Sequence, residues 1–185
     1  MPKIIVTKED WIKLGFNFFS EKGEAGIVVE KMAKKLKVNK SSFYWYFKTK
    51  QEFIEEVVKY WVFSETEQII NTNQTKRNAI DKWNEFLNIA FKNDPYLEFI
   101  YFLKRYALKH KEIQKTIDKI DNRRLSFVAD LLEELGFSKE NSNIKSSIFY
   151  NYLIGYHEMI RHKKQEGNYL ETVKQEINHF IKITE

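Results

Sequence analysis

The chain has 185 residues, of which 43% are hydrophobic, and its 31 Lys and Arg against 26 Asp and Glu leave a net charge of +5. Because the sequence contains no cysteine, disulfides, thiol catalysis and thiolate metal sites are excluded. No apolar run approaches the roughly twenty residues that span a bilayer, and charges at Lys8, Glu9 and Asp10 interrupt the apolar segment that a secretory signal needs, so we expect a cytoplasmic protein without membrane contacts.

Helix-period hydrophobic patterns are frequent and alternating strand patterns are few, which predicts an all-α fold. The first predicted helix begins at Thr7 and ends near Gly23. Thr7 and Asp10 have the spacing of a capping box, and glycine is favoured just past a helix end. The buried stripe of this helix is predicted to contain Trp11, Leu14, Phe18 and Phe19.

Two short helices are predicted next, separated by a tight turn. The apolar residues of the first recur at i, i+3, i+4 and i+7, and they are Val29, Met32, Ala33 and Leu36. Only Lys37, Val38 and Asn39 remain before the second helix, which is the turn length of a helix-turn-helix. We expect Lys37 to adopt a left-handed backbone there.

The second short helix, from about Lys40 to Phe47, combines hydroxyls, phenols and lysines. Lysines can neutralise phosphates, and hydroxyls and phenols can donate hydrogen bonds to phosphate oxygens or base edges. Phe43 and Phe47, four residues apart, can anchor the opposite face of the helix. Composition alone favours an amphipathic helix with a solvated basic side. The helix and turn that precede it favour a DNA-reading helix.

The chain resembles the TetR (tetracycline-repressor-like) family of bacterial regulators over roughly residues 7–65. The resemblance rests on the order of helix lengths and on Gly23, Met32-Ala33, Val38 and the run Tyr44-Trp45-Tyr46-Phe47-Lys48-Thr49-Lys50. It implies a three-helix DNA-binding domain, assigned to residues 5–65 with its helix-turn-helix at about 28–47. It also implies a helical effector-binding and dimerisation domain, assigned to residues 66–185.

The resemblance further implies DNA contacts, mostly with phosphates, by Lys40, Ser42, Tyr44, Tyr46 and Lys50. We add Val28, Ser41 and Trp45 to this predicted DNA-binding set. The family often has Thr or Ser at the position of Val28 and glycine at the positions of Lys37 and Ser41. We expect these departures to change operator preference and to leave DNA binding intact.

The positive charge is concentrated near the predicted helix-turn-helix. Residues 1–50 carry eleven Lys and Arg against five Asp and Glu, a balance of +6, whereas residues 51–185 carry twenty against twenty-one, a balance of −1. A basic segment that coincides with a helix-turn-helix is the electrostatic pattern expected of phosphate neutralisation.

A long linker helix is predicted to open at Thr49, which forms a second capping-box pattern with Glu52. Because this helix directly follows the DNA-reading helix, a tilt of its far end would move that helix. The polar run Asn71–Thr75 is predicted to be a loop. Further helices are predicted at 76–92, 95–109, 112–135, 139–164 and 169–183, with Asp94 as a possible cap and Pro95 in the first turn of its helix.

The C-terminal part is rich in aromatic residues. An apolar pocket lined by rings with a few hydroxyls is the usual form of a small-molecule site. The predicted effector pocket contains Trp83, Phe86, Phe99, Phe102, Tyr106, Phe149 and Tyr152. An aromatic core without a cavity is an equally simple interpretation of the same residues.

The last two predicted helices have apolar stripes suited to self-association. The predicted homodimer interface contains Ile144, Ile148, Tyr152, Gly155, Tyr156, Met159, Leu170, Val173, Ile177 and Phe180. Gly155 would permit close helix approach, and two-fold pairing would hold two DNA-reading helices about one DNA turn, ~34 Å, apart. Alternatively, these stripes close the core of a single chain.

Sequence signals of catalysis are missing. His110, His157, His162 and His179 do not form an i, i+4 pair with an adjacent glutamate, and no Gly-x-Ser-x-Gly elbow or glycine-rich phosphate loop occurs. We therefore expect no enzyme activity, cofactor or metal. The leading hypothesis is a transcriptional regulator, usually a repressor, that a small apolar or aromatic effector releases from a palindromic double-stranded operator. The alternative is a helical ligand-binding or interaction protein that has lost specific DNA reading.

Overall fold

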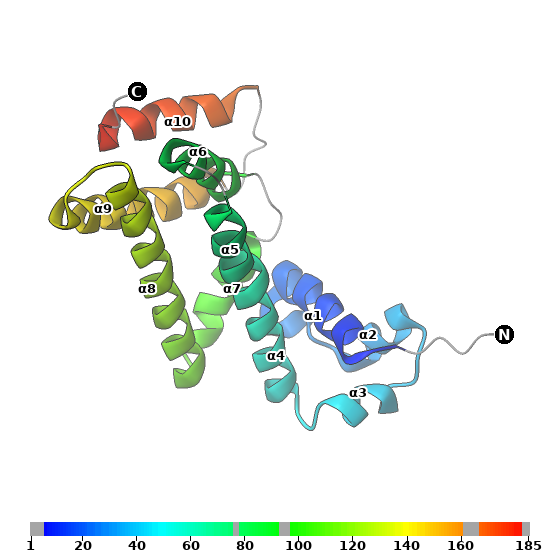
Figure 1. The fold of residues 1–185 in the computed structure, drawn as a ribbon. Helices are drawn as coiled ribbons and strands as arrows, with labels where there is room; N and C mark the ends of the chain where they lie inside the picture. The colour runs from blue at the N-terminus through cyan, green and yellow to red at the C-terminus, as the bar shows by residue number, and fades with distance from the viewer. Residues whose placement is uncertain (1–5, 76–77, 93–96, 161–166, 183–185) are drawn as a thin grey trace. The chain divides into compact units, whose positions relative to one another are not determined.

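The computed structural model describes residues 6–75, 78–92, 97–160 and 167–182. Its elements, in chain order, are α1 (Lys8–Lys22), the 3-10 helix η1 (Gly23–Gly26), α2 (Val29–Leu36), α3 (Ser41–Tyr46), α4 (Lys50–Val62), the π-helix η2 (Phe63–Glu67), α5 (Gln68–Gln74), α6 (Ala79–Ala90), α7 (Leu97–Ala107), α8 (Lys111–Glu134), α9 (Lys139–Ile160) and α10 (Tyr169–Ile181) (Figure 1). These described residues form no strand, and the predicted all-α fold is confirmed. None of the helices in these ranges combines the length and apolar character needed to cross a membrane.

The chain divides into two compact units. The first unit joins Met1–Thr66 to Pro95–Asp118, and the second joins Glu67–Asp94 to Lys119–Glu185. The chain first passes from one unit to the other between Thr66 and Glu67, one residue after the predicted domain boundary at 65/66. The segment 95–118, however, groups with the N-terminal helices, whereas the sequence-based division assigned it to the C-terminal domain.

Helix α1 begins with the predicted capping box. The Asp10 N–H donates to Thr7 Oγ1 at 3.2 Å, and the Thr7 N–H donates to the Asp10 carboxylate at 2.8 Å. The Thr7 hydroxyl also donates to this carboxylate, at 2.7 Å. The bonds that the carboxylate accepts from the Thr7 N–H and hydroxyl lower the pKa of Asp10, because they stabilise its charged form. The sequence therefore located the start of this helix correctly.

The buried face of α1 differs from the predicted stripe. Trp11 and Phe19 are fully buried as predicted, but Phe16 is buried in place of Leu14 and Phe18, which are half-buried. Helix α4 approaches α1 closely at Gly15, where an added Cβ would collide with the Phe53 ring. This approach determines which side of α1 is buried. A small residue thus sets which side of α1 meets α4.

Aromatic rings fill the core of the first unit. Around α3, the Phe43 ring centroid lies 5.3 Å from Trp11 and 5.1 Å from Phe47. Towards α7, Phe99 lies 5.0 Å from Phe19 and 5.5 Å from Trp61. These contacts make α1 the common partner of α3, α4 and α7, and they fix the orientation of α3 within the unit.

The second unit has its own core, built from α5, α6, α8, α9 and α10. Its buried cluster includes Trp83, Leu87, Leu132, Phe149 and Ile177. Helices α6, α8 and α10 begin and end near the predicted residues, and α9 begins at the predicted residue. Asp94 and Pro95, and the predicted end of the fourth of these helices at Lys164, lie outside the described residues.

The predicted loop at Asn71–Thr75 is wrong, because α5 continues to Gln74. Asn73 is fully buried, and its amide Nδ2 donates to the Lys82 carbonyl at 2.8 Å. Ile70, one turn earlier, is also buried in the second core. A polar sequence thus stays helical because tertiary contacts hold it, and the chain turns only at Thr75, whose hydroxyl donates to the Thr72 carbonyl at 2.7 Å.

Candidate nucleic-acid interface

The turn between α2 and α3 is fixed by hydrogen bonds. Lys37 has the predicted left-handed backbone, with φ 58° and ψ 39°. The Val38 N–H donates to the Ala33 carbonyl at 3.0 Å, which closes α2 in the manner of a Schellman motif. The Asn39 side-chain oxygen accepts from the Ser41 N–H at 2.9 Å, which starts α3. The two helices therefore meet in a defined helix-turn-helix.

Helix α3 buries one face and presents the other to solvent. Phe43 and Phe47, the residue directly after α3, are buried in the aromatic core. On the opposite side Ser41 is exposed, Tyr44 is 56% exposed and Trp45 is 79% exposed. An exposed tryptophan is unusual, because burying so large a ring is favourable. The solvent face of α3 thus offers a hydroxyl, a phenol and an indole.

Two predicted DNA contacts, Ser42 and Tyr46, already make hydrogen bonds within the protein. The Tyr46 hydroxyl donates to the Val6 carbonyl at 3.1 Å, and its ring stacks against Trp45 with an interplanar angle of 10°. The Ser42 hydroxyl accepts from the Trp11 indole at 3.4 Å and keeps its own proton to donate. Tyr46 therefore uses its one O–H internally and supports Trp45, whereas Ser42 retains a donor.

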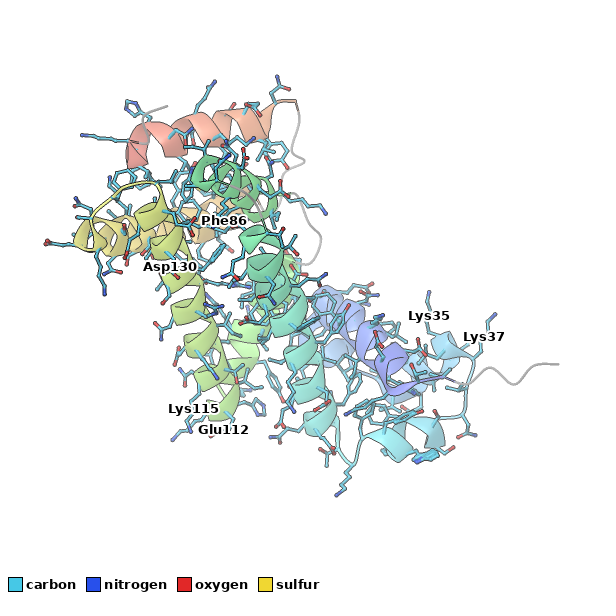
Figure 2. The ribbon with its side chains drawn as sticks, viewed as in Figure 1. Lys35, Lys37, Phe86, Glu112, Lys115 and Asp130 are labelled. Atoms are coloured by element: carbon cyan, nitrogen blue, oxygen red, sulfur yellow. The ribbon has the colours of Figure 1, made fainter. Side chains whose placement is uncertain are left out.

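The predicted phosphate-binding lysines lie beside carboxylates. Lys40 Nζ is 3.5 Å from Glu30 Oε1, and Lys50 Nζ is 3.8 Å from Glu24 Oε1. All four side chains are more than 40% exposed, so each pair contributes little to stability. A phosphate bound by either lysine would have to compete with its carboxylate, a feature for which the sequence pattern offered no signal. Figure 2 shows two other lysines, Lys35 and Lys37, extending into solvent from the end of α2.

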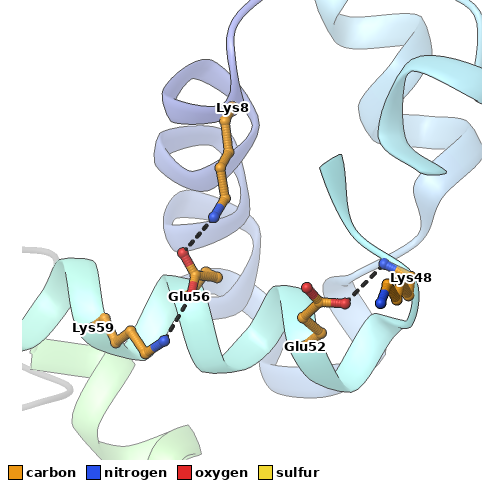
Figure 3. Close-up of polar contacts among 5 residues, drawn as sticks. All are labelled: Lys8, Lys48, Glu52, Glu56 and Lys59. Atoms are coloured by element: carbon orange, nitrogen blue, oxygen red, sulfur yellow. Dashed lines mark hydrogen bonds and ion pairs between the residues drawn. The ribbon is translucent and has the colours of Figure 1, made fainter. Parts of the chain in front are cut away.

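The connection from α3 to α4 is capped. Thr49 Oγ1 accepts from the Glu52 N–H at 3.0 Å, as predicted. The Glu52 carboxylate accepts from the Lys48 N–H at 2.8 Å, one residue before the position expected in a capping box (Figure 3). Both bonds restrain the chain between α3 and α4.

A second polar contact ties α1 to α4. The Glu56 carboxylate accepts hydrogen bonds from Lys59 and Lys8, each at 2.7 Å (Figure 3). Both bonds lower the pKa of Glu56, and the bond from Lys59 has the larger effect. Lys8 also lies 5.6 Å from the centroid of the Phe47 ring at the end of α3. The carboxylate thus joins two helices that carry the aromatic core under α3.

Val28 occupies the N-cap of α2. Its backbone is extended, with φ −118° and ψ 106°, and no side-chain hydrogen bond caps the helix. The hydrocarbon side chain is half-buried and has no donor or acceptor for a phosphate. Of the residues predicted to bind DNA, Val28 can therefore offer only van der Waals contact through its side chain.

The net charge of the whole chain lies on the first unit. Its two segments carry seventeen Lys and Arg against twelve Asp and Glu, a balance of +5, whereas the second unit carries fourteen of each. The unit that presents α3 is therefore also the unit that would attract a polyanion.

Comparison with known proteins supports this description of the first unit. Residues 12–57, which contain α2, α3 and their turn, match the family model of bacterial regulatory proteins of the tetR family. The HTH-type negative transcriptional regulator IcaR of the biofilm operon icaADBC, from Staphylococcus aureus strain Newman, is 30% identical over 135 residues. The chain belongs to the TetR family. The aligned residues are 72% of this chain and 66% of IcaR, slightly less than two thirds of that relative.

Solved structures share the TetR-family fold with this chain at low identity. A Saccharomonospora viridis protein in complex with choline has a TM-score of 0.80 and 11% identity, with 95% of each chain covered. The reduced form of Escherichia coli NemR has a TM-score of 0.77 and 16% identity, covering 97% of this chain and 98% of NemR. At such identities the likeness concerns the fold alone.

The predicted effector-pocket residues of this TetR-family chain are divided between its two units. Phe99, Phe102 and Tyr106 belong to the first unit, where Phe99 is fully buried against α1. Trp83, Phe86, Phe149 and Tyr152 belong to the second unit. There the Phe149 ring centroid lies 5.5 Å from both Trp83 and Phe86, so these rings pack directly on one another.

His157, to which the sequence analysis assigned no role, lies at the edge of this second aromatic cluster. The His157 ring stacks on Phe91, and its Nε2 lies 2.7 Å from the Ala90 carbonyl oxygen. Its Nδ1 is buried, with no hydrogen-bond partner in the described part of the chain. Burial is the main cause that lowers the pKa of His157. The neutral ring therefore offers a hydrogen-bonding atom inside aromatic surroundings.

The predicted dimer interface is accessible on α9 and partly buried on α10. Ile144, Ile148, Gly155 and Met159 are exposed, and Tyr152 and Tyr156 are half-buried. On α10, Phe180 is 40% exposed and Leu170 is half-buried, but Val173 and Ile177 lie in the core of the second unit. Buried residues cannot meet a partner, so Val173 and Ile177 are removed from the predicted interface. They close the core of their own chain, which was the alternative interpretation.

Proposed function

We propose that this TetR-family protein is a DNA-binding transcriptional regulator that acts as a repressor on a palindromic operator. The observation that carries the proposal is the solvent face of α3. There Ser41, Tyr44 and Trp45 project from a helix whose orientation is fixed by the buried Phe43 and Phe47. The net charge of +5 on the same unit favours binding to a phosphate backbone. An operator on chromosomal DNA would place the protein in the cytoplasm.

Each group in the predicted DNA-binding set has a distinct proposed role. Lys40 and Lys50 neutralise phosphates after exchanging their carboxylate partners for phosphate oxygens. Ser41, Ser42 and Tyr44 donate hydrogen bonds, and Trp45 offers an apolar ring to base edges or sugars. Tyr46 acts through Trp45, which it supports by stacking. Sequence preference would then come mainly from the middle of α3, and affinity from the flanking lysines.

The proposed active form is a homodimer that pairs through the exposed stripe of α9. This stripe contains Ile144, Ile148 and Met159, which are respectively 53%, 43% and 69% exposed. Exposed apolar side chains in a row favour a partner surface, and two-fold pairing matches a palindromic operator. Phe180 of α10 extends the surface, because its ring centroid lies 6.3 Å from that of Tyr152.

The proposed regulatory step is release from DNA by a small apolar or aromatic effector bound in the second unit. The aromatic cluster of Trp83, Phe86, Phe91 and Phe149 would contact the apolar part of the effector, and the unpartnered Nδ1 of His157 would accept a hydrogen bond from it. The choline complex of the S. viridis neighbour is an example of small-molecule binding within this fold. Effector binding would act by favouring a conformation with lower DNA affinity.

The test is a titration of the protein against a labelled duplex from the region upstream of its own gene, at physiological salt and with unrelated duplex as competitor. A specific regulator is expected to bind its operator at least about a thousandfold more tightly than unrelated DNA. Replacing Trp45 with alanine should reduce that ratio. Equal binding to upstream, neighbouring-promoter and unrelated duplexes would instead indicate a helical ligand-binding or interaction protein without specific DNA reading.

A further inference from the structure

The end of α7 and the start of α8 carry a dense basic segment outside the helix-turn-helix. From residue 104 to 111 the chain contains Lys104, Arg105, Lys109, His110 and Lys111 and no Asp or Glu. Lys104, Arg105, Lys109 and Lys111 are exposed, and the intervening Leu108 is 82% exposed. We refer to residues 104–111 as the basic turn segment. Its four Lys and Arg charges are therefore concentrated where α7 ends and α8 begins.

The basic turn segment belongs to the first unit, the unit that presents α3. It is anchored there by aromatic residues of α7. A Cβ added at Gly23 would lie 2.7 Å from the Phe102 ring, and the Tyr106 ring centroid is 6.1 Å from that of Phe19. The His110 ring stacks on Tyr106 with centroids 3.8 Å apart, which holds the turn against α7.

The basic turn segment also lies on the side of the unit where α4 begins. The connection runs through η1, because Phe102 of α7 packs against Gly23, and the next residue of η1 is Glu24. Glu24 in turn pairs with Lys50, the first residue of α4. In Figure 1 the starts of α8 and α4 and the whole of α3 lie along the same edge of the first unit. The segment is thus connected to Lys50, at the start of α4, through α7 and η1.

The charges of the basic turn segment are not compensated as those of Lys40 and Lys50 are. In the described part of the chain no ion pair involves Lys104, Lys109 or Lys111. Arg105 donates from Nη1 to the Tyr101 hydroxyl at 2.8 Å, a neutral partner that leaves its charge available. The carboxylate that follows, Glu112, pairs with Lys115 at 2.8 Å (Figure 2).

We propose that the basic turn segment is a second phosphate-binding surface, which contacts the sugar–phosphate backbone of the duplex beyond the base pairs that α3 reads. This inference rests on the proposed function. Flexible lysines without fixed neighbours suit phosphates, which tolerate variable geometry, and do not suit base edges, which require fixed donors. Because charges separated by more than about 8 Å are screened at physiological salt, the contribution requires close approach of the backbone.

The test compares the salt dependence of DNA binding between two charge-matched double variants. Lys109→Gln with Lys111→Gln removes two charges from the basic turn segment. Lys92→Gln with Lys139→Gln removes two charges from exposed positions of the second unit. All four positions are exposed, so both variants should keep the thermal midpoint of the wild type, which is measured first.

The plot of log K against log salt is expected to be shallower for the Lys109/Lys111 variant. The slope should change by about 0.9 for each phosphate that the variant no longer neutralises, or nearly two in total. Affinity for operator and for unrelated duplex should fall by a similar factor, because binding to phosphates carries no sequence information. Hydroxyl-radical footprints should show less protection at sugars beyond the base pairs that α3 reads. The Lys92/Lys139 variant should retain the wild-type slope and footprint.

An unchanged slope in the Lys109/Lys111 variant, or an equal decrease in both double variants, would overturn the second surface and leave the helix-turn-helix proposal intact. Conversely, wild-type protein that binds operator and unrelated duplex equally would remove the proposed specific regulation. The salt slopes on unrelated duplex would still decide whether residues 104–111 contact phosphate. The two failures are therefore distinguishable.

Discussion

A hydroxyl at position 28 could both cap α2 and donate a hydrogen bond to a phosphate. It stands at the N-cap of α2 with an extended backbone and no side-chain hydrogen bond to the helix. Threonine has nearly the same shape, and its hydroxyl can accept from a free N–H of the first turn. Val28→Thr is therefore expected to raise the free energy of unfolding by about 1 kcal/mol, measured by urea denaturation.

The same Val28→Thr change should tighten DNA binding, because the hydroxyl can also donate to a phosphate oxygen. Val28→Ala is the control, since it shortens the side chain without adding an acceptor and should stabilise neither the helix nor the complex. A Thr variant with wild-type stability would show that solvent already satisfies the first turn of α2.

The pair of Glu30 and Lys40 gives a second prediction at the scale of single residues. Glu30→Gln removes a carboxylate 3.5 Å from a lysine proposed to bind phosphate. Because exposed pairs are worth about 1 kcal/mol or less, DNA affinity should increase up to about fivefold, measured by fluorescence anisotropy. Glu171→Gln is the matched control, since Glu171 lies 3.5 Å from Lys174 in the second unit. Equal increases in both variants would indicate a general effect of net charge and count against a local competition at Lys40.

At the scale of elements, Glu56 couples α1 to α4 in a pH-dependent way. Its folded pKa is lowered from the ordinary value of 4.5, chiefly by hydrogen bonds from Lys59 and Lys8. The unfolded chain therefore binds a proton more readily, so the stabilisation is present above about pH 4.5 and is lost as pH falls through the lowered folded value.

Glu56→Gln should accordingly lower the free energy of unfolding at pH 7, by about 1 kcal/mol or less since the carboxylate is partly exposed. The difference from wild type should shrink towards pH 3, as measured by urea denaturation at both pH values. Glu9→Gln, which alters an exposed i, i+4 pair within α1, is the control and should change stability less. A difference that stays constant with pH would contradict the coupling.

The elements also show what the sequence could and could not predict. Local signals sufficed for the Thr7 cap, the left-handed Lys37 and the two helices of the helix-turn-helix, because short-range sterics and hydrogen bonds decide these features. They failed at Asn71–Thr75, where burial of Asn73 keeps a polar segment helical. They also offered no sign of the π-helix η2, which separates α4 from α5 within the predicted linker helix.

The candidate DNA-binding site likewise has features that the sequence could predict and features that it could not. The exposed positions of α3 followed from its helical period, but the internal partners Val6, Glu24 and Glu30 depend on contacts between different elements. The basic run from 104 to 111 was visible in the sequence, yet its place in the first unit depends on the packing of Phe102 and Tyr106 against α1 and η1. The hydrophobic period identifies the apolar side of a helix, but it does not show which of the two cores that side packs against.

At the scale of the whole molecule, the proposed dimer depends on one face of α9. Ile148 is 43% exposed near the middle of this face, whereas Ile80, on α6 of the same unit, is 45% exposed and lies outside the stripe. A charge at position 148 would have to be desolvated on pairing, which is costly without a partner charge. Ile148→Lys should therefore produce a folded monomer in analytical ultracentrifugation, and Ile80→Lys should remain dimeric.

The operator affinity of the two variants connects assembly with function. A monomer contacts a single half-site, so it lacks the high effective concentration with which the second DNA-binding unit of a dimer engages the other half-site. Ile148→Lys is expected to lower the affinity for a palindromic duplex by at least about a hundredfold and to leave the affinity for a single half-site unchanged. A monomeric variant that still binds the palindrome at wild-type affinity would show that pairing through α9 does not contribute to DNA recognition, whereas a dimeric Ile148→Lys would place the interface on another surface.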